Sequence, residues 1–205
     1  LDIEATDVTD NRYFEDLANG VGNTSQIALE RRMDLQYFDG PWTVLLRVQD
    51  FETLDEEGIT PEERPYRRLP QVAARGYWPE APLGLEASID GELTWFDRNT
   101  GVTGLRGHVL PRLALPLEWQ GITLRPAVGA DFTGYSLDDT AAGANDTPSR
   151  ALPIYTVDLS TVLERRSGTG RRYLQTLEPR LQFVKIPFED QQDLPLFDTI
   201  NPDFN

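Results

Sequence analysis

The chain has 205 residues and a formal net charge of -15, which disfavours a nucleic-acid partner held by bulk electrostatics. It has no cysteine, so disulfides and thiolate metal sites are excluded within these residues. No apolar run approaches the roughly 20 residues of a membrane-spanning helix. The hydrophobic content of 39% and the mean hydropathy of -0.44 would also suit an ordinary soluble domain, so composition leaves the fold class open.

Strand patterns with a period of two dominate the chain. Between Leu83 and Trp95 the odd positions are apolar or glycine, whereas the even positions from Glu86 to Thr94 are polar or charged. Similar segments bounded by turn residues predict about nine strands. They are Leu1–Ala5, Ile27–Phe38, Trp42–Glu52, Arg68–Trp78, Leu83–Phe96, Leu105–Glu118, Ile122–Tyr135, Ala151–Arg165 and Arg172–Ile186. Most have roughly the 10 residues that a tilted strand needs to cross a bilayer.

The connections between these strands alternate in length. Short ones at 39–41, 79–82, 120–121 and 167–170 alternate with long ones at 6–26, 53–67, 97–104, 136–150 and from 187 onward. An up-and-down transmembrane β-barrel has this parity, with short periplasmic turns and long extracellular loops. The sequence therefore predicts an all-β fold of antiparallel transmembrane β-barrel strands, part of a larger barrel.

Each of the four tryptophans lies at the end of a strand pattern and on its apolar phase: Trp42, Trp78, Trp95 and Trp119. Aromatic girdles occupy these places where barrel strands leave hydrocarbon for water. Tryptophans at strand ends also occur in soluble sheets, but their common phase favours membrane-interface aromatics.

Two features depart from the pattern. Arg31 lies on the lipid-facing phase between Leu29 and Met33, so either it snorkels toward outer-leaflet phosphates or the strand register differs. Prolines also interrupt predicted strands, where each removes a ladder donor and calls for a bulge or weak pairing. These prolines are Pro111, Pro126, Pro153 and Pro179.

No catalytic, cofactor or metal site is predicted. His108, the single histidine, shares a phase with Arg106 and Arg112, and no adjacent serine or carboxylate completes a triad. Glu86, Asp90 and Glu92 have the spacing of a hydrophilic wall. The acidic clusters within 7–16, 55–63 and 189–198 are interpreted as solvated loop charge, with divalent-cation bridges to lipid phosphates as the alternative.

Three stretches resemble a known family. They are Asp10-Asn11-Arg12-Tyr13-Phe14-Glu15-Asp16-Leu17, Pro65-Tyr66-Arg67-Arg68-Leu69-Pro70-Gln71, and Thr176-Leu177-Glu178-Pro179-Arg180 followed by Ile186-Pro187-Phe188-Glu189-Asp190-Gln191. In order and spacing they are similar to the barrel domain of the LptD family, which assembles lipopolysaccharide at the Gram-negative outer membrane. The resemblance spans nearly the whole chain and implies that residues 1–205 are a partial LptD-like transmembrane barrel domain. The chain is interpreted as a piece of a longer protein, whose jellyroll domain and remaining strands lie outside it.

The resemblance also implies partners. The family takes lipopolysaccharide from a periplasmic LptA-like bridge through the jellyroll, holds an LptE-like plug lipoprotein in the barrel lumen, and releases the lipid through a lateral opening. On this basis the chain is expected in the cell outer membrane, in contact with outer-membrane lipid. Strand phase assigns a set of residues to the luminal face, toward the plug or the saccharide: Glu86, Asp90, Glu92, Arg106, His108, Arg112, Glu178 and Arg180.

Three alternatives stay open at this point. A porin-like outer-membrane channel has the same architecture without a plug protein. A soluble β-sandwich binding module would bury its apolar faces against each other. An outer-membrane hydrolase would need His108 as a base, and no positioned partner for it is evident in the sequence.

Overall fold

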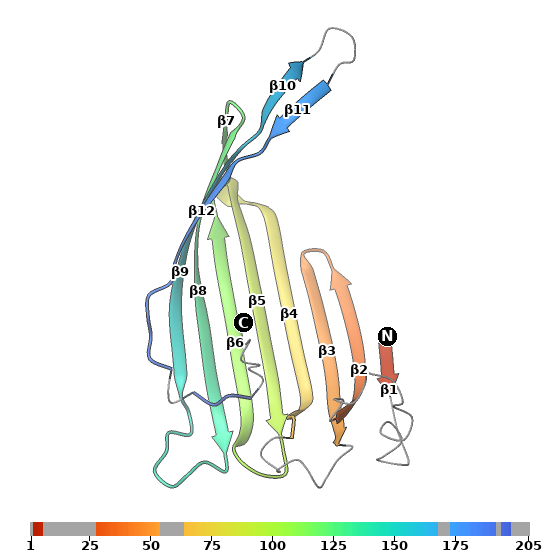
Figure 1. The fold of residues 1–205 in the computed structure, drawn as a ribbon. Helices are drawn as coiled ribbons and strands as arrows, with labels where there is room; N and C mark the ends of the chain where they lie inside the picture. The colour runs from red at the N-terminus through yellow and green to blue at the C-terminus, as the bar shows by residue number, and fades with distance from the viewer. Residues whose placement is uncertain (1, 6–27, 54–63, 168–172, 192–193, 198–205) are drawn as a thin grey trace, which may run out of the picture.

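Figure 1 shows a computed structural model of the chain, which describes residues 2–5, 28–53, 64–167, 173–191 and 194–197. The strands are β1 (Asp2–Ala5), β2 (Ala28–Asp39), β3 (Trp42–Thr53), β4 (Arg67–Ala81), β5 (Leu85–Asp97), β6 (Thr103–Ala114), β7 (Leu117–Trp119), β8 (Ile122–Asp138), β9 (Ser149–Thr161), β10 (Leu163–Ser167), β11 (Tyr173–Leu177) and β12 (Arg180–Lys185). A single 3-10 turn, η1 (Pro82–Gly84), joins β4 to β5. None of the helical structure in the described residues is long and apolar enough to cross a membrane.

The main sheet is an antiparallel meander. Its strand order is β1-β2-β3-β4-β5-β6-β8-β9-β12, with β7 paired to β8, while β10 and β11 form a separate two-stranded ribbon. Strands that follow one another along the chain are neighbours in the sheet, as an up-and-down topology requires. The sheet is open, with β1 and β12 at its two ends (Figure 1). The predicted all-β antiparallel fold class is confirmed.

The predicted strands recur with small changes at their ends. Three of them are split: Leu105–Glu118 into β6 and β7, Ala151–Arg165 into β9 and β10, and Arg172–Ile186 into β11 and β12. Pro179 lies at the last of these breaks. Pro111, Pro126 and Pro153 remain inside strands, and none of them causes a register shift. In the ladder between β6 and β8, Leu110 and Pro111 are unpaired, and pairing resumes at Arg112 in the same register. The register shifts lie instead on β3, between Arg47 and Gln49, and on β4, between Arg68 and Gln71 and between Trp78 and Ala81.

The two ends of the sheet differ in their connections. The turns at 40–41, 82–84 and 120–121 all lie at one end, and the longer loops 98–102 and 139–148 lie at the other (Figure 1). The predicted parity of loop length is therefore present in the described part of the chain. The first and second acidic clusters, and Asp193 and Asp198 of the third, lie outside the described residues.

Burial is inverted relative to a soluble domain. The described buried residues are mostly polar: Asp34, Gln49, Gln71, Thr94, Thr103, Thr133 and Thr156, against Phe96, Ala114, Ala127 and Phe197. Large apolar side chains stay exposed on the opposite face, among them Leu93 at 49%, Val128 at 52% and Phe132 at 45%. A soluble domain buries such side chains, and a contiguous exposed apolar face marks a surface that contacts another phase or molecule. The sheet, as described, is a single layer, so the β-sandwich alternative is not favoured.

Candidate functional site

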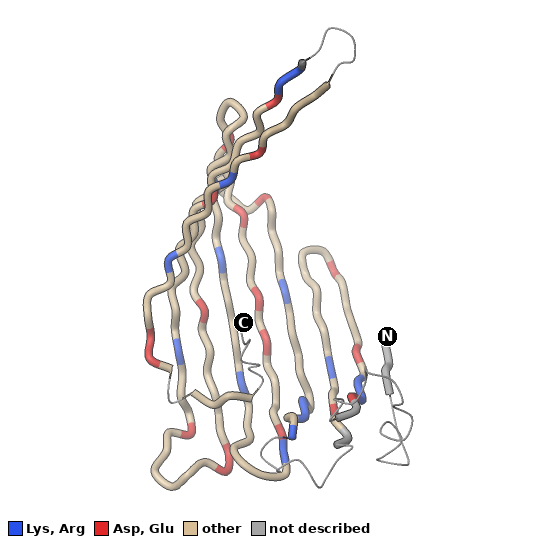
Figure 2. The backbone as a smooth tube through the Cα atoms, in the orientation of Figure 1, with Lys and Arg blue, Asp and Glu red and all other residues tan. Residues whose placement is uncertain are grey.

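The polar face of the sheet is built from rows of residues that lie directly opposite one another on neighbouring strands. One row crosses β2 to β8 as Asp34, Arg47, Gln71, Thr94, Arg106 and Tyr135. The next row runs through Ala73, Glu92, His108, Thr133 and Arg150. Partners in an antiparallel ladder share a face, so these rows define one polar surface. Figure 2 shows charged residues along the length of the central strands, and not only at their ends.

The register brings together most of the residues predicted from phase. Glu86, Asp90, Glu92, Arg106, His108, Arg112 and Arg180 all share this face. Glu178 does not lie in a strand, because it falls in the break between β11 and β12, where it is exposed. The shared face is a property of the sheet, whereas the lumen that it would line remains a prediction.

Asp34 and Arg47 form the most buried ion pair of this face. Arg47 donates from Nε to Oδ1 and from Nη2 to Oδ2 of Asp34, both at 2.8 Å, in the bidentate geometry that guanidinium and carboxylate favour. Arg32 Nε lies 3.5 Å from Asp34 Oδ2, and its Nη1 lies 3.3 Å from Glu30 Oε1. Gln49 Nε2 also donates to Glu30 at 2.8 Å. These contacts link β2 to β3 from the polar side.

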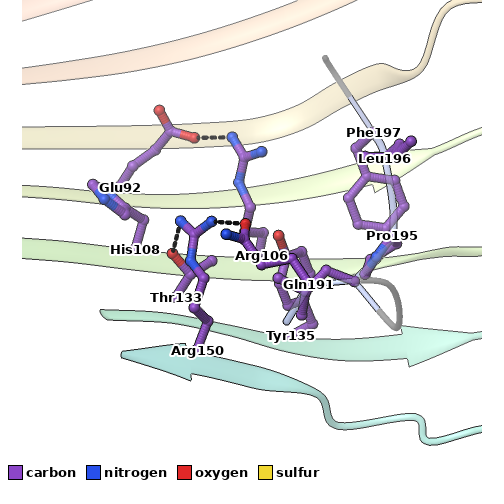
Figure 3. A pocket seen from close by; sticks show the side chains of 11 residues that line it. Glu92, Arg106, His108, Thr133, Tyr135, Arg150, Gln191, Pro195, Leu196 and Phe197 are labelled. Atoms are coloured by element: carbon purple, nitrogen blue, oxygen red, sulfur yellow. Dashed lines mark hydrogen bonds and ion pairs between the residues drawn. The ribbon is translucent and has the colours of Figure 1, made fainter. Parts of the chain in front are cut away.

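A second cluster centres on Asp131 of β8. His108 Nε2 on β6 lies 3.4 Å from Asp131 Oδ2, and Arg150 Nη2 on β9 lies 3.2 Å from Oδ1. The Thr133 hydroxyl donates to Asp131 at 3.0 Å. It accepts from Arg150 at 3.3 Å (Figure 3). His108 therefore has a carboxylate neighbour that the sequence did not reveal. Thr133 is the hydroxyl opposite His108 in the ladder, and it donates to Asp131.

Carboxylates are paired with arginines across the rest of this face. Glu92 accepts from Arg106 and from the Thr94 hydroxyl, each at 2.9 Å. The other cross-strand ion pairs are Arg75–Asp90 at 3.2 Å, Arg180–Asp158 at 2.6 Å and Arg125–Glu86. Each pair joins two strands and neutralises both charges, so the polar face is hydrophilic without a large local excess of either sign.

A cavity of about 340 Å³ lies over the long-loop half of the polar face. Its floor includes Glu92, His108 and Arg150, and the segment Leu194–Phe197 forms one of its walls (Figure 3). No group of three or more metal-ligating side chains that could hold an ion occurs among the described residues. The cavity is therefore a polar pocket with alternating charge.

Phe197 attaches the C-terminal segment to this face. Its ring stacks on Phe96 with centroids 4.6 Å apart and planes at 15°, and it lies 5.0 Å from Tyr66 and 6.1 Å from Tyr135. Phe197 is only 7% exposed. Arg150 adds a polar link by donating to Gln191 Oε1 at 2.5 Å. Phe197 thus completes an aromatic cluster within a face that is otherwise largely hydrophilic.

The apolar face carries the tryptophans. Trp42 and Trp78 meet edge to face with centroids 5.3 Å apart, over Gly76, where a Cβ atom would lie 2.5 Å from the Trp78 ring. Trp95 and Trp119 also share the apolar phase, through their partners Leu105 and Ile122. The girdle assignment remains a prediction.

Arg31 lies on the apolar phase in the predicted register, directly opposite Asp50, and the next outward pair is Met33 with Val48. The alternative of a shifted register is therefore wrong, and the sequence reading had not identified Asp50 as its neighbour. Lys185, opposite Tyr155, is a second basic residue on this face that the sequence reading did not single out.

Comparison with known proteins identifies the family. The family model LptD, described as LPS transport system D, matches residues 1–205. The LPS-assembly protein LptD of Nitrosococcus oceani is 38% identical over 200 residues, which cover 96% of this chain and 27% of that protein. The Azoarcus sp. protein of the same name is 37% identical over 211 residues, covering 100% of this chain and 26% of its own length. The chain thus spans about a quarter of the length of the curated relatives it matches. On this match, and with an antiparallel sheet of the expected topology, the chain belongs to the LptD family.

Proposed function

We propose that residues 1–205 form part of the wall of an outer-membrane barrel, and that the full-length protein inserts lipopolysaccharide into the outer leaflet. The relatives that match this chain are named LPS-assembly proteins. The observation that carries the proposal is the inverted burial of the sheet, with charges paired on one face and large apolar side chains exposed on the other. A barrel wall between lipid and a wet lumen requires this distribution.

The proposal sets the orientation of the sheet. The face with Leu93, Val128 and Phe132 meets acyl chains, and the face with the ion pairs borders the lumen. The short turns lie on the periplasmic side and the long loops outside, so that Trp42, Trp78 and Trp119 lie in the inner girdle and Trp95 in the outer one. Residues 1–205 are then one partial barrel domain in the cell outer membrane.

The partners follow from the family. Lipopolysaccharide would pass along the polar face, an LptE-like plug lipoprotein would occupy the lumen, and an LptA-like bridge would deliver lipid to a jellyroll domain outside these residues. The luminal set from Glu86 to Arg180 would contact the plug or the saccharide. Passage requires hydration and exchangeable hydrogen bonds, which paired arginines and carboxylates provide. No covalent step is needed.

Photo-crosslinking in cells tests the orientation. A crosslinking amino acid at Val128, on the apolar face, should give lipid adducts in the full-length protein. The same amino acid at Ser88, whose partner Arg112 is on the polar face, should give adducts with the plug or with lipopolysaccharide. The opposite pattern would refute the assignment of faces.

Depletion of the full-length protein tests the activity. Newly made lipopolysaccharide should then fail to reach the cell surface, and the intact gene should restore it. A porin-like channel predicts unchanged surface lipopolysaccharide with a loss of small-solute permeability.

A further inference from the structure

The ribbon of β10 and β11 extends beyond the main sheet at its short-turn end (Figure 1). The last row that β9 shares with β8 pairs Thr161 with Ile122, and Ile122 in turn pairs with Trp119. Beyond this row β10 pairs only with β11. An isolated two-stranded ribbon is at best marginally stable in water, so a surface that it contacts would contribute to its order.

The ribbon keeps the register and the phase of the strands that precede it. The Thr161 amide donates to the Pro179 carbonyl at 3.2 Å, and the ladder then resumes with Leu163 opposite Leu177. Leu159 of β9 and its partner Leu181 lie on the apolar face, and Leu163 and Leu177 each lie four residues farther along. An even number of residues keeps the same face of a strand, so the Leu163–Leu177 pair continues the apolar phase. Leu163 and Leu177 are 54% and 63% exposed. The apolar face of the sheet thus runs one pair past the level of Trp119.

Basic and aromatic side chains follow this apolar pair. Arg165 and Arg166 are exposed, and Tyr173 is 60% exposed. None of the ion pairs in the described residues involves either arginine. The sequence of the connecting segment contains two more arginines, in a chain whose net charge is -15. In the described strands of the ribbon, Arg165 and Arg166 outnumber the one carboxylate, Glu164.

The position of the arginines matches a headgroup layer. Arg165 lies four residues beyond Thr161, which is roughly 13 Å along a strand, or about 10 Å along the membrane normal for a tilt of about 40°. The headgroup layer is roughly 5–8 Å thick on each side. Because Trp119 lies at the start of that layer in the proposed orientation, the backbone of Arg165 lies just beyond the layer. Its long side chain can reach back to the phosphates.

We infer that the β10–β11 ribbon is a contact site for the anionic phospholipid headgroups of the periplasmic leaflet. Arg165, on the lipid-facing phase, binds phosphates, and Arg166, on the opposite phase, adds positive charge at the same level. Leu163 and Leu177 rest against the boundary of the acyl chains, and Tyr173, opposite Ser167, lies beyond Arg165 on the same phase. An apolar pair with basic and aromatic side chains beside it is typical of membrane-interface anchors. An acidic protein partner would explain the arginines but not the continuation of the lipid-facing phase. The inference rests on the orientation given under the proposed function.

A photo-crosslinking amino acid at Tyr173 of the full-length protein in cells tests the contact, with Tyr155 on the apolar face of β9 as the matched control. We expect phospholipid adducts at both positions. A protein adduct at Tyr173, or none, with lipid adducts at Tyr155 would overturn the ribbon contact alone. Absence of lipid adducts at Tyr155 would instead overturn the orientation on which the inference rests.

The charge dependence is tested in nanodiscs of phosphatidylethanolamine with and without phosphatidylglycerol. The phosphatidylglycerol adduct at Tyr173 should decrease about fivefold for each arginine replaced by glutamine. The variant R165Q/R166Q should lose the preference for anionic lipid, and R165K/R166K should retain it. High salt should weaken the contact in the parent protein. Equal adduct yields in R165Q/R166Q and R165K/R166K would contradict the role of charge.

Discussion

Asp34 on β2 lies directly opposite Arg47 on β3, and the two side chains make a bidentate ion pair on the polar face, with the Asp34 side chain only 6% exposed. Replacing Arg47 by alanine leaves a buried carboxylate with only Arg32 as partner. Because Arg47 is itself 24% exposed, we expect a loss of about 2 kcal/mol in the free energy of unfolding. Urea unfolding of the full-length protein in lipid vesicles measures it. The double variant D34L/R47L should recover part of the loss, since it removes both charges; a double variant less stable than R47A would contradict this account.

Asp131 holds His108, Thr133 and Arg150 together from three strands. In D131A, Arg150 should lose its carboxylate and hold Gln191 less firmly. Hydrogen exchange at the Leu194 amide, which donates to the Gln191 carbonyl at 3.1 Å, should therefore become faster. D158A removes a comparable carboxylate from the same face, at a distance from that segment, and should leave this exchange unchanged. Equal acceleration in both variants would show a general loss of stability instead.

Phe197 is the main apolar contact between its segment and the sheet. Replacing it by alanine should weaken this local docking by about 3 kcal/mol, which is roughly a hundredfold rise in the undocked fraction. F197L keeps an apolar side chain and should have a smaller effect. Hydrogen exchange at the amides of Leu194 and Leu196, which precede Phe197, measures this docking. Unchanged exchange in F197A would show that the ring does not hold the segment.

Gly76 leaves the space in which the Trp78 ring lies. A Cβ atom there would be 2.5 Å from that ring and 3.0 Å from Trp42, so G76A should displace Trp78 and cost about 1–3 kcal/mol. Gly134 is the matched control, because nothing lies within 4 Å of its added Cβ. Tryptophan fluorescence during urea unfolding reports both variants. A stability loss in G134A as large as that in G76A would point to backbone effects and not to the ring.

Arg31 and Asp50 form an opposed pair of charged positions on the apolar face. R31A should lower the free energy of unfolding by about 1 kcal/mol, because Asp50 then lacks the charge opposite it. The exchange R31D/D50R restores opposite charges across the same two strands and should recover most of the loss. Unfolding in vesicles measures both. No recovery in the exchanged variant would indicate that Arg31 acts through lipid phosphates and not through Asp50.

Much of the fold could be predicted because its determinants are local. Alternation of side chains identifies the strands and their two faces, and turn residues separate short connections from long ones. Leu85–Asp97 illustrates this, since its phase alone places Glu86, Asp90 and Glu92 on one face. The ends of strands were less predictable where prolines allow a ladder either to continue, as at Pro126, or to stop, as at Pro179.

The contacts within the polar face could not be predicted, because they depend on register between strands. The polar phase of Asp131 is evident in the sequence, but its approach to His108 depends on how β8 pairs with β6. Three register shifts along β3 and β4 decide which side chains meet there. The contact of Phe197 with Phe96 joins residues from distant parts of the sequence, and no periodic signal indicates it.

The cross-strand pairing of arginines with carboxylates has a consequence for the motion of a charged cargo. A wall with a net positive field would capture a phosphorylated saccharide, and a negative one would repel it. Most guanidinium groups of this face are donors already shared with a neighbouring carboxylate, so under the proposed function a passing anion would meet a lattice of small dipoles. It can exchange one weak bond for the next without a deep energy minimum, which favours continuous sliding over arrest.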